Sequence, residues 1–244
     1  MRTLTASELL TVWEEGAFRL PVEQALLLLA AACSDMSPEA LARLSIGQRD
    51  ARLLTLRAWL FGPQLTSLAV CPECGDQQQV TFDSADIGIQ VADEAPEIFA
   101  LNVDGYAVDF RLPNSDDMRA IAGSGDVAAG RTLLLARCLQ VQHDKTTVAV
   151  DQLPPQVVDA IVERMAEADP QADVQLSLAC TTCGHNWLAA FDIVSFFWAE
   201  IDAWAQRILR DVHSLATAYG WREADVLALS AQRRQVYLDM IGGL

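Results

Sequence analysis

Two Cys-x-x-Cys-Gly motifs, at residues 71–75 and 180–184, limit what this 244-residue chain can fold into more than any other feature. Two thiolates at this spacing lie on one tight turn, and the glycine that follows allows the positive φ with which the chain returns into a second strand. Each motif offers two metal ligands, whereas a closed structural zinc site needs four. The sequence therefore predicts that the motifs meet at one zinc ion, whose ligands would be Cys71, Cys74, Cys180 and Cys183.

The separation of the motifs departs from an ordinary zinc ribbon, in which the two pairs lie about 15–20 residues apart. We therefore predict a discontinuous ribbon, with residues 84–173 inserted between its halves. One alternative is a redox pair, which would precede a helix rather than join two strands, and another is empty or disulfide-linked cysteines. His185 could replace one thiolate, although a surface histidine beside the turn explains it as well. Four thiolates leave no coordination position open, so the expected role of the zinc is structural.

Hairpins are predicted in the middle of the chain and helices at both of its ends. In residues 193–219, apolar side chains recur about every 3.7 positions, which is the period of a helix stripe. The most apolar run, residues 25–33, is far shorter than the roughly 20 residues that a membrane span needs, and it indicates a buried helix. Asp104-Gly105 is typical of a hairpin turn. The expected strands are residues 65–70, 80–82, 98–103, 106–112, 174–179 and 187–191.

These elements predict an α+β fold in which helical N- and C-terminal parts bracket a small β-hairpin middle. The N-terminal helical part would comprise residues 1–62, and the C-terminal helical part residues 192–244. Between them, residues 63–191 would form an α+β middle that holds the discontinuous four-cysteine zinc ribbon. If the two motifs meet, residues 65–191 close on themselves, and one compact domain is the expected arrangement overall.

Composition indicates which classes of partner suit the chain. With 17 basic and 33 acidic side chains, the formal net charge is −16, so the surface should repel nucleic acid. A hydrophobic content of 52% excludes a disordered chain. All the basic residues except Lys145 are arginines, which favour planar pairing with carboxylates. We expect a cytoplasmic protein that binds other proteins, with neither a membrane nor nucleic acid as partner.

Catalytic motifs are absent from the sequence. The three histidines lie in no nucleophile–base pattern, and there is neither a Gly-x-Ser-x-Gly motif nor a phosphate-binding Gly-x-x-x-x-Gly-Lys loop. Asp116 and Asp117 could form a metal pair, but acidic residues in the first turn of a helix are the ordinary response to the helix dipole. We therefore expect no enzymatic activity. The remaining cysteines, Cys33 and Cys138, lie in apolar helical contexts and are expected in the core.

Several segments resemble, in sequence order, the phage T4-type baseplate hub assembly chaperones. They are residues 61–63, 71–75, 110–113, 180–185 and 196–200, and the end of that family is resembled by residues 219–230 with Arg233 and Arg234. The resemblance implies a factor that helps to build the baseplate or hub of a contractile phage tail or of a tail-like injection system. Its partners would be baseplate, hub or spike proteins, and the protein could be associated with the particle. Only the four cysteines are carried over as ligands.

The aromatic side chains near residue 197 leave two interpretations open. Phe196 and Trp198 project away from the apolar stripe of their helix, so they either pack under a second layer or form a binding patch. We take them, with Trp221, Arg233 and Arg234, as candidate partner-binding residues. A stable structural subunit of the finished particle is the alternative function. A nucleic-acid-binding zinc ribbon is a third, which acidic residues such as Glu73 and Asp76 beside the first motif disfavour.

Overall fold

The computed structural model describes residues 1–88 and 96–242, and its contacts group the chain into two units. The first unit comprises Met1–Asp35 and Val194–Leu244, and the second comprises Met36–Ile193. Parts of the expected insertion (89–95) and of the expected C-terminal part (243–244) lie outside the described residues. The division at residues 62 and 191 stays a prediction. The overall class is α+β, as expected from the sequence.

The first unit is helical and is organised around one long helix, α9 (Ile193–Tyr219). Ala205 and Ile208 of α9 pack against Leu10, and the Trp13 indole donates to Asp202 at 2.9 Å. The expected long helix is thus confirmed, and the apolar run lies in a buried helix that begins with a proline at its first position. The other helices of this unit are α1 (Ala6–Gly16), α2 (Pro21–Ala32), α10 (Glu223–Leu227) and α11 (Ala231–Gly242).

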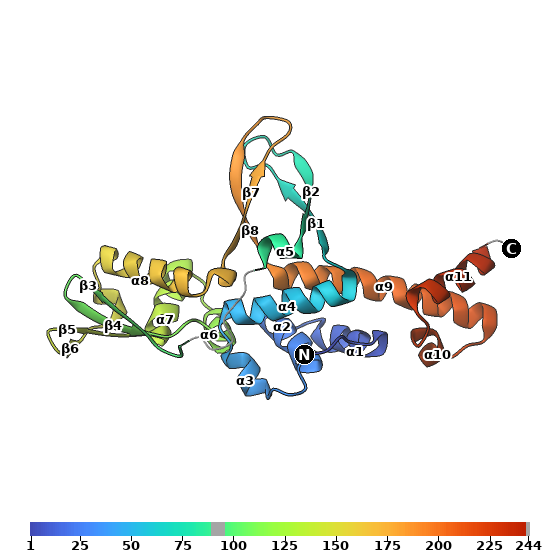
Figure 1. Ribbon diagram of the computed structural model, residues 1–244, viewed down its shortest axis with the longest axis horizontal. Helices are drawn as coiled ribbons and strands as arrows, with labels where there is room; N and C mark the ends of the chain where they lie inside the picture. The colour runs from blue at the N-terminus through green and yellow to red at the C-terminus, as the bar shows by residue number, and fades with distance from the viewer. Residues whose placement is uncertain (89–95, 243–244) are drawn as a thin grey trace. The chain divides into compact units, whose positions relative to one another are not determined.

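Two antiparallel hairpins in the second unit carry the cysteine motifs. The first pairs β1 (Gln64–Val70) with β2 (Gln77–Asp83), and the second pairs β7 (Val174–Ala179) with β8 (Asn186–Phe191). Figure 1 shows the two hairpins side by side, although about ninety residues separate them in sequence. Their facing side chains meet at Phe82 and Phe191, whose rings lie edge to face with centroids 5.4 Å apart.

The chain between these hairpins forms a separate four-stranded antiparallel sheet of order β3-β4-β5-β6. The turn between its first two strands is the expected Asp104-Gly105, and both residues adopt positive φ. The last two strands follow α7 directly and were not among the expected elements. The strands are β3 (Phe99–Val103), β4 (Tyr106–Phe110), β5 (Leu139–His143) and β6 (Thr146–Thr147).

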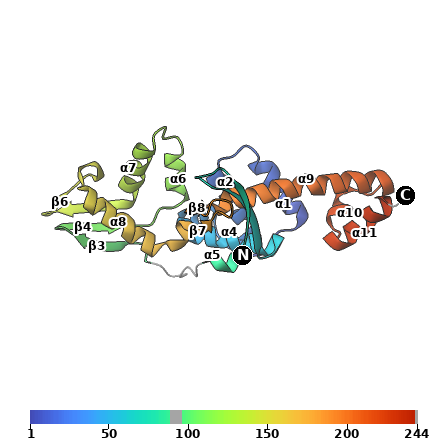
Figure 2. The same ribbon diagram turned by 90° about the horizontal axis from the view of Figure 1, so that it is seen from above.

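Helices α7 (Val127–Cys138) and α8 (Pro155–Ala168) cover one face of this sheet (Figure 2). The core between them contains Val108 and Phe110 from the sheet and Ile161 from α8, each almost fully buried. The other helices of the second unit are α3 (Pro38–Arg43), α4 (Ile46–Phe61), α5 (Ser84–Ile87) and α6 (Ser115–Ile121), with 3-10 turns at Val150–Gln152 and Pro170–Ala172.

The entry into the second hairpin is tied to the start of α4. The buried carboxylate of Asp169 accepts a hydrogen bond from the Gly47 N–H at 3.0 Å. A Cβ at Gly47 would overlap this carboxylate, so the close approach requires glycine. The contact places the beginning of β7 beside the helix that leads into β1. Among the residues described, no helix combines the length and the apolar character needed to cross a membrane.

Candidate metal centre

The two cysteine motifs fold into nearly identical turns. In the first, the Gly75 N–H donates to the Cys71 carbonyl at 2.9 Å, and in the second the Gly184 N–H donates to the Cys180 carbonyl at 2.9 Å. Gly75 and Gly184 have φ values of 74° and 75°, a region that costs other residues energy. Each turn thus holds two thiols on one side of a hairpin end, as the sequence predicts.

The four thiols come together at the ends of the paired hairpins. The Cys71 and Cys183 sulfurs are 3.7 Å apart, those of Cys74 and Cys180 are 3.6 Å apart, and all four ligand atoms lie within 4.8 Å of one another. Four sulfurs placed tetrahedrally at about 2.3 Å from a zinc ion would be about 3.8 Å apart. The separations exceed the roughly 2.05 Å of a disulfide, so the four cysteines of the motifs are thiols. The group could therefore hold a metal ion.

Side chains that directly follow the first motif also hold the second motif in place. Asp76 accepts a hydrogen bond from the Thr182 hydroxyl at 2.7 Å. With its amide oriented so that both ends are satisfied, Gln78 donates to the Ala179 carbonyl at 3.2 Å and accepts from the Thr181 N–H at 2.7 Å. These polar contacts fix the register of the two turns independently of the thiols. From the sequence, Asp76 was recognisable only as an acidic neighbour of the first motif, and no local pattern marked Gln78.

Burial and protonation differ among the four thiols. Cys71 and Cys180 are buried, whereas Cys74 and Cys183 are exposed. The Cys183 N–H, and after it the Thr182 N–H, lowers the pKa of Cys180 to about 7. The Asp76 N–H also lowers the pKa of Cys74. Hydrogen bonds with the neighbouring thiols, above all that of Cys183, and desolvation outweigh this effect and raise the pKa of Cys74 to about 12. Each further thiolate in such a group is disfavoured until a cation compensates for the charge.

His185, the alternative ligand, lies outside the group of four cysteines that could hold a metal. Its ring is stacked against Trp187 with centroids 6.3 Å apart, and its carbonyl accepts a hydrogen bond from the Cys180 N–H at 2.8 Å. The backbone of His185 therefore helps to close the second turn. In the first turn, the Asp76 carbonyl does the same by accepting a hydrogen bond from the Cys71 N–H at 2.9 Å.

Several candidate partner-binding residues have contacts within the first unit. Trp198 lies against Gly16, where a Cβ would overlap its indole. Trp221 stacks on Tyr219 and meets Tyr237 edge to face, both with centroids 4.9 Å apart. Arg234 pairs with Asp211 at 3.1 Å. Phe196 is half-buried and the Arg233 side chain is exposed. A role of these five residues in binding a partner stays a prediction.

Asp117 takes part in a buried ion pair that its sequence neighbourhood does not predict. Its carboxylate is fully buried and accepts hydrogen bonds from Arg111 at 2.5 and 2.8 Å, from Arg137 at 2.8 Å and from the Asn114 N–H at 3.0 Å. Its position in the first turn of α6 agrees with the expected response to the helix dipole. Arg111 precedes Asp117 by six residues and Arg137 follows it by 20, so both lie outside the helical turn of Asp117 and no local pattern identifies them.

Comparison with protein-family models finds a match to the T4 bacteriophage base plate protein over residues 7–198. The matched region includes both cysteine motifs and the inserted sheet. Comparisons with curated proteins and with solved structures find no match. Because the match covers well over half of the chain, the chain belongs to the T4 bacteriophage base plate protein family.

Proposed function

We propose that the protein is a non-enzymatic assembly factor, a chaperone or adaptor that binds baseplate, hub or spike proteins of a contractile phage tail or tail-like injection system. The observation that carries this proposal is the family match over residues 7–198. The net charge of −16 supports it, because an acidic protein can mask a basic surface of a partner until that surface is needed in assembly.

We further propose that zinc occupies the four-cysteine group. An all-thiolate tetrahedral set suits zinc, and the sulfur separations of 3.6 and 3.7 Å fit its coordination sphere. When bound, the ion supplies a cross-link between the two hairpins and leaves no position for water or substrate. The chain's own part is to present the thiols on two matched turns and to hold the turns together through Asp76 and Gln78.

The proposed assembly role can be tested by co-expressing the full chain with the hub and spike proteins of the same tail. We expect the chain to co-purify with one of them and to increase its soluble yield. Deleting the gene that encodes this chain should reduce the number of assembled particles. Unchanged hub solubility together with unchanged assembly would contradict the proposal, as would salt-dependent binding to DNA.

A permanent subunit of the finished particle is the second candidate, because the family description fits a component of the base plate equally well. Quantitative mass spectrometry of purified particles distinguishes the two roles. An assembly factor should be absent or present at far below one copy per hub subunit. A copy number that matches the hub would favour the structural subunit.

A further inference from the structure

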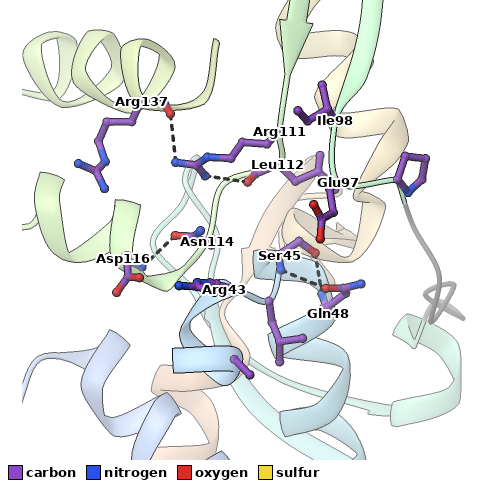
Figure 3. A pocket seen from close by; sticks show the side chains of 13 residues that line it. Arg43, Ser45, Gln48, Glu97, Ile98, Arg111, Leu112, Asn114, Asp116 and Arg137 are labelled. Carbon is purple, nitrogen blue, oxygen red and sulfur yellow. Dashed lines mark hydrogen bonds between the residues drawn. The ribbon is translucent and has the colours of Figure 1, made fainter. Parts of the chain in front are cut away.

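A cavity of about 690 Å³ lies within the second unit, where four segments of the chain meet. The end of α3 and the start of α4 form one side, residues 96–98 a second, and residues after β4 a third, while Arg137 of α7 completes it (Figure 3). A neighbouring cavity of about 400 Å³ shares Ile98, Arg111 and Arg137 with the first. Neither the metal centre nor the expected partner-binding residues belong to this region.

Three of the chain's 16 arginines, Arg43, Arg111 and Arg137, line the larger cavity. Arg111 is engaged within the protein, because its two terminal NH2 groups donate to Asp117 and to the carbonyls of Leu112 and Arg137. It therefore holds the wall of the cavity, and few of its N–H groups remain for a ligand.

The other two arginines keep donors for a ligand. Arg137 donates through Nε to Asp117 at 2.8 Å, which orients its guanidinium, while its terminal NH2 groups form no hydrogen bond with the described residues. The Arg43 side chain is exposed and forms neither a hydrogen bond nor an ion pair with residues 1–88 or 96–242. Two guanidiniums, one of them held in orientation, thus remain available at the cavity.

Uncharged groups beside these arginines suit a peptide. Gln48 and Asn114 use their amide oxygens to cap α4 and α6, at 3.2 Å from the Ser45 N–H and 3.0 Å from the Asp116 N–H. Their NH2 groups form no hydrogen bond with the described residues and can donate to a peptide carbonyl. Ile98 and Leu112 add apolar surface, and Ile98 is 66% exposed.

The charges around the cavity favour a ligand with one anionic group. Asp117 lies behind the wall, and Asp116 on the wall pairs with Arg119 at 3.0 Å. Of the residues that line the cavity, Arg43, Arg111 and Arg137 are basic and Glu97 and Asp116 are acidic, which leaves one positive charge on the lining in a chain of net charge −16. Glu39 lies outside the lining, and its carboxylate is attracted to Arg43. A polyphosphate would be repelled by Glu97 and Asp116, whereas a single carboxylate can pair with a guanidinium in bidentate geometry.

We propose that this cavity binds an acidic peptide segment of a partner protein, with an aspartate or glutamate carboxylate paired to Arg43 and Arg137. An apolar side chain next to the acidic residue would lie against Ile98 and Leu112. That the peptide belongs to a baseplate, hub or spike protein rests on the proposed function. The carboxylate chemistry does not, because it follows from the lining of the cavity.

The experiment titrates the full chain with N-acetyl-leucyl-aspartyl-leucine amide and follows backbone and arginine Nε resonances by NMR. We expect saturable shifts of the Arg137 Nε resonance and of backbone amides in residues 43–48 and 111–114. The matched peptide with asparagine in place of aspartate should bind at least tenfold more weakly, because it cannot form the charge-assisted pair.

Arg43→Ala tests the site without disturbing the buried ion pairs of Asp117 with Arg111 and Arg137, because Arg43 takes no part in them. We expect this variant to bind the acidic peptide at least tenfold more weakly. Arg131→Ala removes the same charge from the exposed side of α7, where Arg131 lies 3.8 Å from Asp159, and should leave binding unchanged.

Equal binding of the two peptides, or an unchanged affinity in Arg43→Ala, would overturn the proposal. Inorganic phosphate that bound more tightly than the peptide would overturn it as well, and would indicate a site for phosphate. The titration uses no tail protein, so its result is independent of the co-expression test. A failed co-expression with a successful titration would leave the carboxylate site standing and remove only the baseplate partner.

Discussion

The paired hairpins and the inserted sheet are two β structures within one unit, and they are stabilised in different ways. In the inserted sheet, Val108 and Phe110 lie under Val157 and Ile161, and all four side chains are almost completely buried. In the hairpins and their turns, only Leu65, Cys71 and Cys180 are buried among the described residues. The hairpins thus only partly bury the face on which they meet, whereas the inserted sheet fully buries side chains of one face under two helices.

This difference shows where the stabilising free energy of each part comes from. Burial of a large apolar side chain contributes about 1.5–3 kcal/mol, so the inserted sheet can be held by its own core. A two-stranded hairpin is marginal in water, and two of them with a small shared core need a further cross-link. The cysteine group could hold a metal ion that supplies this cross-link, and under the zinc proposal the stability of the hairpins depends on the metal.

Removing the metal or one of its ligands should have the largest effect. Structural zinc sites contribute about 10–16 kcal/mol of apparent binding free energy at pH 7, so chelation or Cys71→Ser should release the paired hairpins. Hydrogen exchange should show lost protection in β1, β2, β7 and β8, while the inserted sheet stays protected. Elemental analysis of the unmodified chain should give about one zinc per chain.

Cys33→Ala is the matched control for this experiment, because Cys33 is a buried cysteine of the first unit and lies outside the metal group. Its zinc content should equal that of the unmodified chain. A metal-free protein with four free thiols and fully protected hairpins would contradict the proposed zinc site.

Truncating a core side chain of the inserted sheet should have the next largest effect. In contrast to metal removal, it should destabilise the inserted sheet and leave the hairpins unchanged. Phe110→Ala removes a fully buried ring that stacks on Phe99, with centroids 5.2 Å apart, and should lower the free energy of unfolding by about 3–5 kcal/mol. Urea denaturation measures this loss, and the zinc content should not change. Leu68→Ala, at an exposed position of β1, should alter stability by no more than about 0.5 kcal/mol.

The sequence predicts the metal centre better than it predicts the sheet between its halves. A Cys-x-x-Cys-Gly turn presents two thiols on one side, and a closed zinc site needs four ligands. The meeting of the two motifs could therefore be predicted from the cysteine spacing alone. The hairpin around Asp104-Gly105 carried an equally local signal. In contrast, β5 follows α7 without a break, and its pairing with β4 is a long-range contact without a local signal.

The ion pair at Asp117 shows the same limit on a smaller scale. Its position in the first turn of α6 could be read from sequence, but its burial depends on Arg111 and on Arg137, 20 residues away. The cavity beside it is formed by four segments, none of which contains a recognisable motif. Such sites follow from tertiary packing, which sequence periodicity does not determine.

Removing the Asp117 charge should destabilise the inserted region to a smaller degree. Burial alone would raise the pKa of Asp117, but hydrogen bonds from Arg111, Arg137 and the Asn114 N–H lower it to about 2. A lowered pKa stabilises the folded state above the ordinary value near 3.8, and this contribution is lost as the pH falls toward 2. Because both arginines are more than one third exposed, we expect only about 1–2 kcal/mol.

The measurement is the urea midpoint between pH 5 and pH 2, for the unmodified chain and for Asp117→Asn. The asparagine variant should lack this part of the decline with falling pH. Asp159→Asn, at an exposed position of α8, is the control and should follow the unmodified chain. A variant whose decline equals that of the unmodified chain would show that the Asp117 pair contributes nothing to acid stability.

The smallest effects should come from two turn glycines, and they compare the hairpins with the inserted sheet directly. Gly75 and Gly105 have φ values of 74° and 84°, and a Cβ would meet no atom within 4 Å at Gly75 and only His143, at 3.5 Å, at Gly105. Alanine should therefore cost only backbone strain, about 1 kcal/mol at either position. The backbone strain in Gly75→Ala should weaken zinc binding about fivefold. The strain in Gly105→Ala should instead lower the urea midpoint of the inserted sheet. If Gly75→Ala lowered that midpoint and left zinc affinity unchanged, the two β structures would share one source of stability.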